Sequence, residues 1–149
     1  MIFKSFEIKK NIEDILKNNF FLLYGENEGL KKDIKEEIKL ALKKKDDRIE
    51  NDTLYENEIL SNEENFYDSI YSGSLFGSGK IITINNASDK IIDQIENLYS
   101  KYPENVFFII LSEILEKKSK IRNFFEKETN TVCIPFYEDN KLTLGQVVQ

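Results

Sequence analysis

The run Phe20-Phe21-Leu22-Leu23-Tyr24, closed by Gly25, decides the fold, because no polar residue interrupts it. A strand that helices cover on both faces reads as a continuous apolar run rather than as an alternating pattern. We therefore expect residues 20–24 to form a central strand of a parallel sheet. Residues 106–112 contain a second run of the same kind. We expect these two strands to be neighbours at the centre of the sheet.

Three shorter stretches complete the predicted sheet, at about residues 53–55, 80–85 and 131–135. The first is a weak edge strand, and Pro135 is expected to stop the last one. Between the strands, apolar residues recur every three or four positions, as in amphipathic helices. These predicted helices cover residues 5–17, 30–45, 63–71, 88–99 and 118–128. Strands that alternate with helices predict right-handed crossovers, so we expect a three-layer α/β fold with a mainly parallel five-stranded sheet.

The composition limits the classes of function. The 149 residues suffice for one domain, and 40% hydrophobic with 32% charged residues is typical of a globular protein. A net charge of −6 disfavours a surface that coats DNA. The chain has no histidine, which removes the commonest general base and the commonest metal ligand. We expect neither a metal site nor a cofactor.

The single cysteine, Cys133, excludes an intramolecular disulfide and a zinc site built from cysteines. It lies in a predicted strand, so we expect it to pack as a small core residue. No run approaches the roughly 18 apolar residues of a membrane span, and residues 1–4 do not resemble a signal peptide. We therefore expect a cytoplasmic protein that does not contact a membrane.

Residues 140–149 begin another periodic apolar stretch, with Leu142, Leu144 and Val147. This predicted helix has no place in the expected three layers. We expect residues 1–138 to form one domain and residues 139–149 to begin a following helical domain of a longer protein.

Residues 25–32 follow the first strand and have the outline of a phosphate-binding Walker A loop. Such a loop needs a glycine, four residues, and then Gly-Lys followed by serine or threonine. Aligned from its first glycine, the chain keeps the lysine but has leucine at the second glycine and lysine at the hydroxyl position. We expect a degenerate loop that binds no nucleotide. Its defining residues are Gly25, Gly29, Leu30, Lys31 and Lys32.

Two neighbouring features also disfavour a nucleotide site. Glu26 and Glu28 would place like charge beside any phosphate. After the third strand, where a related ATPase carries paired acidic residues for magnesium and water, the chain has Asn85-Asn86. The sequence therefore keeps the outline of a P-loop without its chemistry.

Leu75 and Phe76 stand side by side in a Gly/Ser-rich turn between a predicted helix and the third strand, flanked by Gly73, Ser74 and Gly77. Turn chemistry requires neither a large aliphatic nor a large aromatic residue. The pair either covers the edge of the core or is displayed for a binding partner. From the residues alone the covering role is favoured, because paired apolar residues usually pack.

Several pieces of the chain, in the same order, resemble the N-terminal domain of the delta subunits of bacterial DNA polymerase III clamp loaders. The resemblance implies an AAA+-like module that has lost ATP binding, followed by two further helical regions. The pieces that carry it are residues 21–26, 28–30, 72–77, 117–122, 124–127 and 134–137.

The resemblance also implies a function. Delta subunits bind the ring-shaped sliding clamp and open one of its interfaces with a Leu-Phe pair, and Leu75 and Phe76 match that pair. Gly73 stands where many relatives carry a larger apolar residue. Leu75 and Phe76 are therefore expected to be displayed, in a non-catalytic subunit whose partners are the sliding clamp and other loader subunits. DNA would be contacted only through the assembled loader.

Two alternatives remain at this point. One is an active small P-loop hydrolase or kinase, which the leucine and lysine substitutions in the loop disfavour. The other is an α/β protein-binding module with a different partner.

Overall fold

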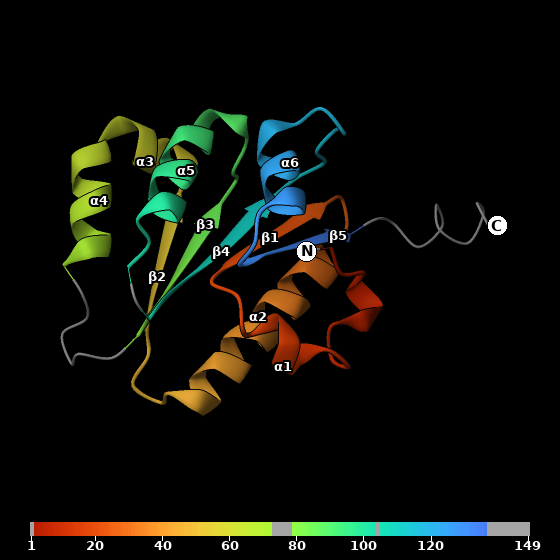
Figure 1. Ribbon diagram of the computed structural model, residues 1–149. Coiled ribbons are helices and arrows are strands. Elements are labelled where there is room, and N and C mark those ends of the chain that lie inside the picture. The colour runs from red at the N-terminus through yellow and green to blue at the C-terminus, as the bar shows by residue number, and fades with distance from the viewer. Residues whose placement is uncertain (1, 73–78, 104, 137–149) are drawn as a thin grey trace.

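The computed structural model describes residues 2–72, 79–103 and 105–136. Within these ranges one sheet has the strand order β2-β3-β4-β1-β5, and every neighbouring pair is parallel (Figure 1). The strands are β1 (Phe20–Gly25), β2 (Glu50–Tyr55), β3 (Lys80–Asn85), β4 (Val106–Ser112) and β5 (Thr131–Phe136). The predicted α/β class and five-stranded parallel sheet are confirmed.

The two continuous apolar runs lie side by side, as predicted. β4 occupies the centre of the sheet and pairs with β1, with Phe20 opposite Phe108 and Leu22 opposite Ile110. Every residue of β1 is buried. β2 lies at one edge, and its residues are mostly exposed.

Helices cover both faces of the sheet (Figure 1). On one face lie α1 and α2, and on the other lie α3 to α6. Their bounds are α1 Ile12–Ile15, α2 Glu28–Lys45, α3 Glu56–Ser61, α4 Glu63–Tyr71, α5 Ile92–Ser100 and α6 Lys120–Lys127. Two short 3-10 helices, η1 (Ser5–Glu7) and η2 (Asp89–Ile91), precede α1 and α5. In the part of the chain that is described, no helix combines the length and the apolar character that crossing a membrane requires.

Successive residues of β1 face opposite sides of the sheet, and each side has its own core. Phe20 and Leu22 belong to a cluster with residues of α3 to α6. Phe21 and Leu23 belong to a second cluster with residues of α1 and α2. This division explains why the strand sequence is apolar at every position.

Cys133 is fully buried in β5 as a free thiol. Burial raises the pKa of this thiol to about 12, and the nearby charge of Glu126 adds to the effect. It packs among the apolar residues of one core cluster, as predicted.

The prediction of one N-terminal helix over residues 5–17 is wrong. The segment forms η1 and α1, which Asn11 separates with a backbone (φ −110°, ψ 19°) that is not helical. The Asn11 side chain donates a hydrogen bond to the Glu7 carbonyl at 2.9 Å. The Asn11 N–H donates to the same carbonyl at 3.0 Å, so two bonds from Asn11 close the turn between η1 and α1.

Pro135 was expected to stop β5, but the strand continues to Phe136. β5 is an edge strand, and Pro135 lies opposite Tyr24 of β1. Two residues earlier, the Cys133 carbonyl accepts from the Phe3 N–H on the outer side of the strand. By strand periodicity the Pro135 nitrogen also faces outward, where its missing N–H costs no bond to β1. The helix predicted after Asn140 lies outside the described residues.

Candidate functional site

A cavity of about 350 Å³ lies at the carboxyl edge of the sheet, where ligands bind in open parallel α/β folds. The start of α2, the end of β3 and the end of β4 surround it. Its lining residues are Glu28, Lys31, Lys32, Lys35, Asn85, Asn86, Leu111, Ser112 and Glu113. The structure thus brings the predicted degenerate loop together with the two asparagines that follow β3.

Gly25 forms a tight turn from β1 into the loop. Its φ of +129° is a conformation that residues with a side chain rarely adopt. A Cβ at this position would fall on the carbonyl oxygen of Phe136 and 2.6 Å from its carbonyl carbon. Gly25 is therefore required by the close approach of β5, independently of any phosphate.

Backbone N–H groups that a P-loop would aim at phosphates are bonded within this protein. The Gly25 N–H donates to the Glu113 carbonyl at 3.0 Å. The Leu30 N–H donates to the Asn27 side chain at 3.1 Å, which caps α2. Leu30 itself is partly buried against the core beside α2, so its side chain fills the space that a glycine would leave open.

Lys31, which stands at the phosphate-lysine position, is turned inward and is only 4% exposed. Its Nζ donates to the Ser112 carbonyl at the end of β4 at 2.8 Å. The same nitrogen forms an ion pair with Glu28 at 2.7 Å. The buried Ser112 carbonyl and the exposed Glu28 carboxylate therefore bind the lysine charge that would meet a phosphate. Lys32 is exposed.

At the end of β3 the cavity presents amides where a related ATPase carries acidic side chains. Asn85 and Asn86 occupy the end of β3, and among the described residues no group of three or more histidine, cysteine or acidic side chains could hold a metal ion. Uncharged amides bind magnesium far more weakly than the carboxylates that usually accompany nucleotide phosphates. The geometry thus supports a degenerate site.

We expect no saturable binding of ATP at millimolar magnesium, because Lys31 is already paired and Lys32 offers no hydroxyl to a metal. Isothermal titration calorimetry of the wild-type protein checks this. Saturable micromolar binding that Lys31→Ala abolishes would contradict it. Lys32→Ala, which changes an exposed lysine of the same cavity, is the matched control.

The predicted binding pair, Leu75 and Phe76, and its neighbours Gly73, Ser74 and Gly77 lie outside the described residues. The described chain ends at Ser72 before them and resumes at Gly79 after them, and both of these ends are anchored at the amino edge of the sheet. At the end of α4, the Tyr71 hydroxyl donates to the Lys101 carbonyl at 2.8 Å. At the start of β3, the Gly79 N–H donates to an Asp46 carboxylate oxygen at 3.1 Å.

A buried lysine joins these two anchored ends. Lys80, the first residue of β3, donates from Nζ to the Ser69 carbonyl of α4 at 2.9 Å and lies 3.7 Å from an Asp52 carboxylate oxygen. The end of α4 and the start of β3 are therefore held at a defined separation. These bonded ends of α4 and β3 flank the segment that carries Leu75 and Phe76. They lie at the amino edge of the sheet, whereas the cavity lies at the carboxyl edge.

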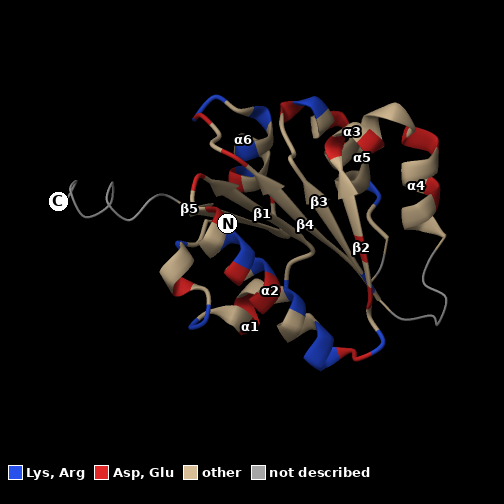
Figure 2. Cartoon of the chain, turned by 180° about the vertical axis from the view of Figure 1, so that it is seen from behind, with Lys and Arg blue, Asp and Glu red and all other residues tan. Residues whose placement is uncertain are grey.

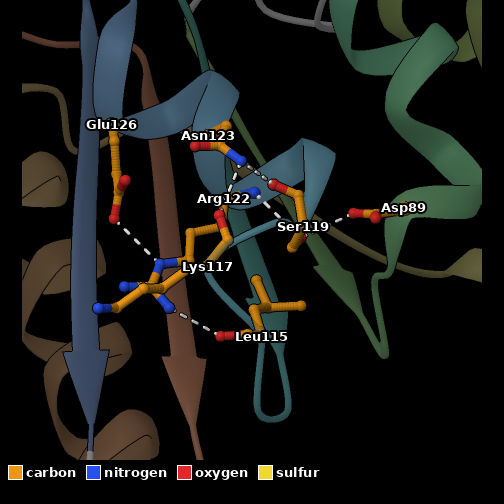
Figure 3. Close-up of polar contacts among 7 residues, drawn as sticks. All are labelled: Asp89, Leu115, Lys117, Ser119, Arg122, Asn123 and Glu126. Carbon is orange, nitrogen blue, oxygen red and sulfur yellow. Dashed lines mark hydrogen bonds and ion pairs between the residues drawn. The ribbon is translucent and has the colours of Figure 1, made fainter.

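A network of polar contacts orders the loop between β4 and α6 (Figure 3). The Asp89 carboxylate accepts from the Ser119 hydroxyl at 2.8 Å and from the Ile121 N–H at 3.0 Å. It also accepts from the Lys120 N–H at 3.1 Å, and so caps the first turn of α6. Desolvation alone would raise the pKa of Asp89, but these hydrogen bonds and the Lys120 charge outweigh it and lower the pKa.

Arg122 fixes the same loop from the other side. Its guanidinium donates to the Leu115 carbonyl at 2.9 Å and to Glu126 at 3.0 Å (Figure 3). It also lies 5.2 Å from the centre of the Tyr24 ring. Asn123 donates to the Lys117 carbonyl at 2.9 Å. The loop begins with Glu113, which lines the cavity and whose carbonyl accepts from the Gly25 N–H at 3.0 Å.

Removing the Asp89 cap is expected to lower the free energy of unfolding by about 1–2 kcal/mol at neutral pH. The folded pKa lies below the unfolded one, so this stabilisation is present above the unfolded pKa, about 3.9, and disappears as pH falls through the folded pKa. Urea unfolding of wild type and Asp89→Ala, from neutral pH down to about pH 3, measures the difference. An equal difference at every pH would contradict the assignment.

Comparison with known protein families decides which family these features belong to. A family model described as "DNA polymerase III, delta subunit" matches residues 21–135. This chain belongs to the DNA polymerase III delta subunit family. The matched range contains the degenerate loop, the anchored ends of α4 and β3, and the Asp89 network.

A solved structure gives the same fold. The Bacillus subtilis DNA clamp loader delta protein (YqeN) is similar with a TM-score of 0.65 at 15% sequence identity. The similarity covers 97% of this chain and 46% of YqeN, so this chain spans less than half of the length of YqeN. A search of curated proteins gives no match.

The resemblance to delta subunits inferred from the sequence is therefore confirmed at the level of the family. The roles of Leu75 and Phe76 within it stay predictions. The Asp89 network was missed because its partners are about 30 residues apart in the chain. The one signal for it was Ser119 before an amphipathic stretch, a residue that caps helices.

Proposed function

We propose that this delta-family chain is a non-catalytic clamp-loader subunit that binds the sliding clamp of DNA polymerase III and opens it. The clamp receives Leu75 and Phe76, and the other loader subunits supply ATP-driven movement. The match of the delta family model to residues 21–135 is the observation that carries this proposal. The Leu-Phe pair lies inside that range.

The carboxyl edge of the sheet supports the non-catalytic part of the proposal. Lys31 is bonded to Ser112 and Glu28, and Leu30 packs against the core beside α2 where a P-loop has its second glycine. A subunit with these contacts can transmit movement without a nucleotide of its own.

The amino edge supports the mechanical part. A subunit that opens a ring by pushing on a partner needs a stiff connection between its contact residues and its core. Lys80 and Tyr71 supply such a connection, because they join the last turn of α4 and the first residue of β3 to neighbouring elements. Force applied at residues 75–76 would pass into the central sheet.

The distribution of charge supports contact with DNA through other subunits only. The charged side chains of α1, α3, α4 and α5 are all acidic, whereas α2 and α6 carry both signs (Figure 2). Proteins that track a DNA backbone instead collect lysine and arginine on one face. With a net charge of −6, a protein partner fits this surface better than a nucleic acid.

A titration of the chain against the sliding clamp from the same source tests the proposal. Immobilised clamp in a surface plasmon resonance cell would report saturable binding, and a labelled clamp interface would report opening. The absence of saturable binding would overturn the proposed function. Binding of the clamp together with micromolar ATP binding would overturn only its non-catalytic part.

A further inference from the structure

We propose that Tyr71 and Tyr102 form a second contact with the protein that receives Leu75 and Phe76. We call these two residues the tyrosine patch. This inference rests on the proposed function, because it takes the sliding clamp as the occupant. It adds a contact surface on the described part of the chain to a binding pair that lies outside it.

The two tyrosines lie together at the amino edge of the sheet. Tyr71 is the last residue of α4, and Tyr102 follows the end of α5 by two residues. The Tyr71 hydroxyl donates to the carbonyl of Lys101, the residue next to Tyr102. Each tyrosine is 46% exposed, so about half of its surface is in contact with solvent.

Both rings are held without being covered. The hydrogen bond to Lys101 fixes the tip of Tyr71. The Tyr102 ring meets the edge of Phe20 at 6.2 Å between centroids, in a T-shaped arrangement. An exposed aromatic ring that is already fixed loses little conformational freedom on binding. Tyrosine is also among the residues that contribute most to protein interfaces.

Chain connectivity limits how far Tyr71 can lie from the predicted anchor. Leu75 follows Tyr71 by four residues, and a fully extended chain advances at most about 3.6 Å per residue, so their Cα atoms lie within roughly 14 Å. A standard interface covers about 800 Å² on each partner, which corresponds to a disc of roughly 16 Å radius. A partner centred on Leu75 would therefore reach Tyr71.

The patch also defines what the partner must offer. Two half-exposed aromatic rings favour a surface that is apolar at its centre. The Tyr71 hydroxyl already donates to Lys101, so only the Tyr102 hydroxyl would favour a hydrogen-bond acceptor at the rim. Lys101, exposed between them, favours a carboxylate there. We therefore expect the clamp to present an apolar area bordered by acidic side chains at this position.

The test compares the double variant Tyr71→Ala/Tyr102→Ala with Tyr55→Ala in clamp-binding titrations of the wild-type chain and its variants. Tyr55 is a matched control, because it is 45% exposed but ends β2 at the opposite edge of the sheet. We expect the double variant to bind the clamp roughly tenfold more weakly. Tyr55→Ala should bind as wild type, with both melting temperatures within a few degrees of it.

Tyr71→Phe separates contact from positioning. It removes the bond to Lys101 but keeps the ring, so a contact role predicts nearly wild-type binding. A loss as large as that of the double variant would overturn the contact role.

The outcomes distinguish this inference from the proposed function. If wild type binds the clamp and the double variant binds equally well, the tyrosine patch is wrong and the proposed function stands. If the wild-type chain itself does not bind the clamp, the proposed function is wrong, and the tyrosine patch, which rests on it, is wrong as well. A tenfold loss shared by Tyr55→Ala would also overturn the patch, because it would show no preference for one edge of the sheet.

Discussion

Replacing Leu75 and Phe76 together with alanine is expected to weaken clamp binding at least roughly a hundredfold while leaving thermal stability nearly unchanged. Central apolar anchors typically cost about 2 kcal/mol or more each on truncation, and about 1.4 kcal/mol corresponds to a factor of ten. Leaving two such side chains exposed forgoes roughly 1.5–3 kcal/mol of burial for each. A partner that covers them recovers that free energy.

The covering role predicts the reverse result for the same double variant. If the pair sealed the core edge, its loss would lower the melting temperature and would not selectively impair binding. Ile114→Ala is a suitable control, because Ile114 is 62% exposed on the loop after β4, far from the amino edge. Measuring the melting temperature and the clamp affinity of both variants decides between the two roles. A large loss of stability without a selective binding defect would defeat the displayed role.

The centre of the fold could be predicted because burial on both faces leaves a direct mark on the sequence. Phe20 to Tyr24 is apolar at every position because alternate residues enter two different cores. β4 has the same property, which is why the two strands could be placed together. The edge strand β2 was harder to detect and longer than expected, because most of its residues face solvent.

Elsewhere the apolar periodicity predicted the wrong helix boundaries, because polar side chains interrupt the helices locally. Ile8, Ile12 and Ile15 have helical spacing and are buried or half-buried, yet Asn11 interrupts the backbone between them. α3 was missed because its six residues are too few for periodicity to register. Its first residue, Glu56, accepts bonds from both the N–H and the hydroxyl of Ser88, a contact that links residues 32 apart.

The departures from the Walker A pattern could be recognised from residue identities alone, but the internal bonds of the loop could not. Leu30 and Lys32 are visible departures from the Walker A pattern. That Lys31 pairs with Ser112 depends on the end of β4 lying beside the start of α2, which follows only from the sheet order. The sequence likewise does not indicate why Gly25 is retained when the second glycine is absent.

Gly25→Ala is expected to lower the free energy of unfolding by roughly 3 kcal/mol or more, which is a large effect for a single substitution. Two costs add. An alanine at φ +129° is strained by about 1–3 kcal/mol, and its Cβ would overlap the Phe136 carbonyl of β5. β5 would have to move away from β1, although the two strands pair from Phe20 to Gly25. Urea unfolding monitored by circular dichroism measures the change.

Gly29→Ala is the matched control in the same loop. Gly29 lies in the first turn of α2, and its nearest neighbour to an added Cβ is the Asn27 side-chain oxygen at 3.9 Å, an ordinary contact. Alanine is the better helix former, so stability should stay the same or rise by up to about 1 kcal/mol. A loss at Gly25 with none at Gly29 means that packing against β5 retains the first glycine. Equal, small effects at both positions would contradict the close approach of Phe136.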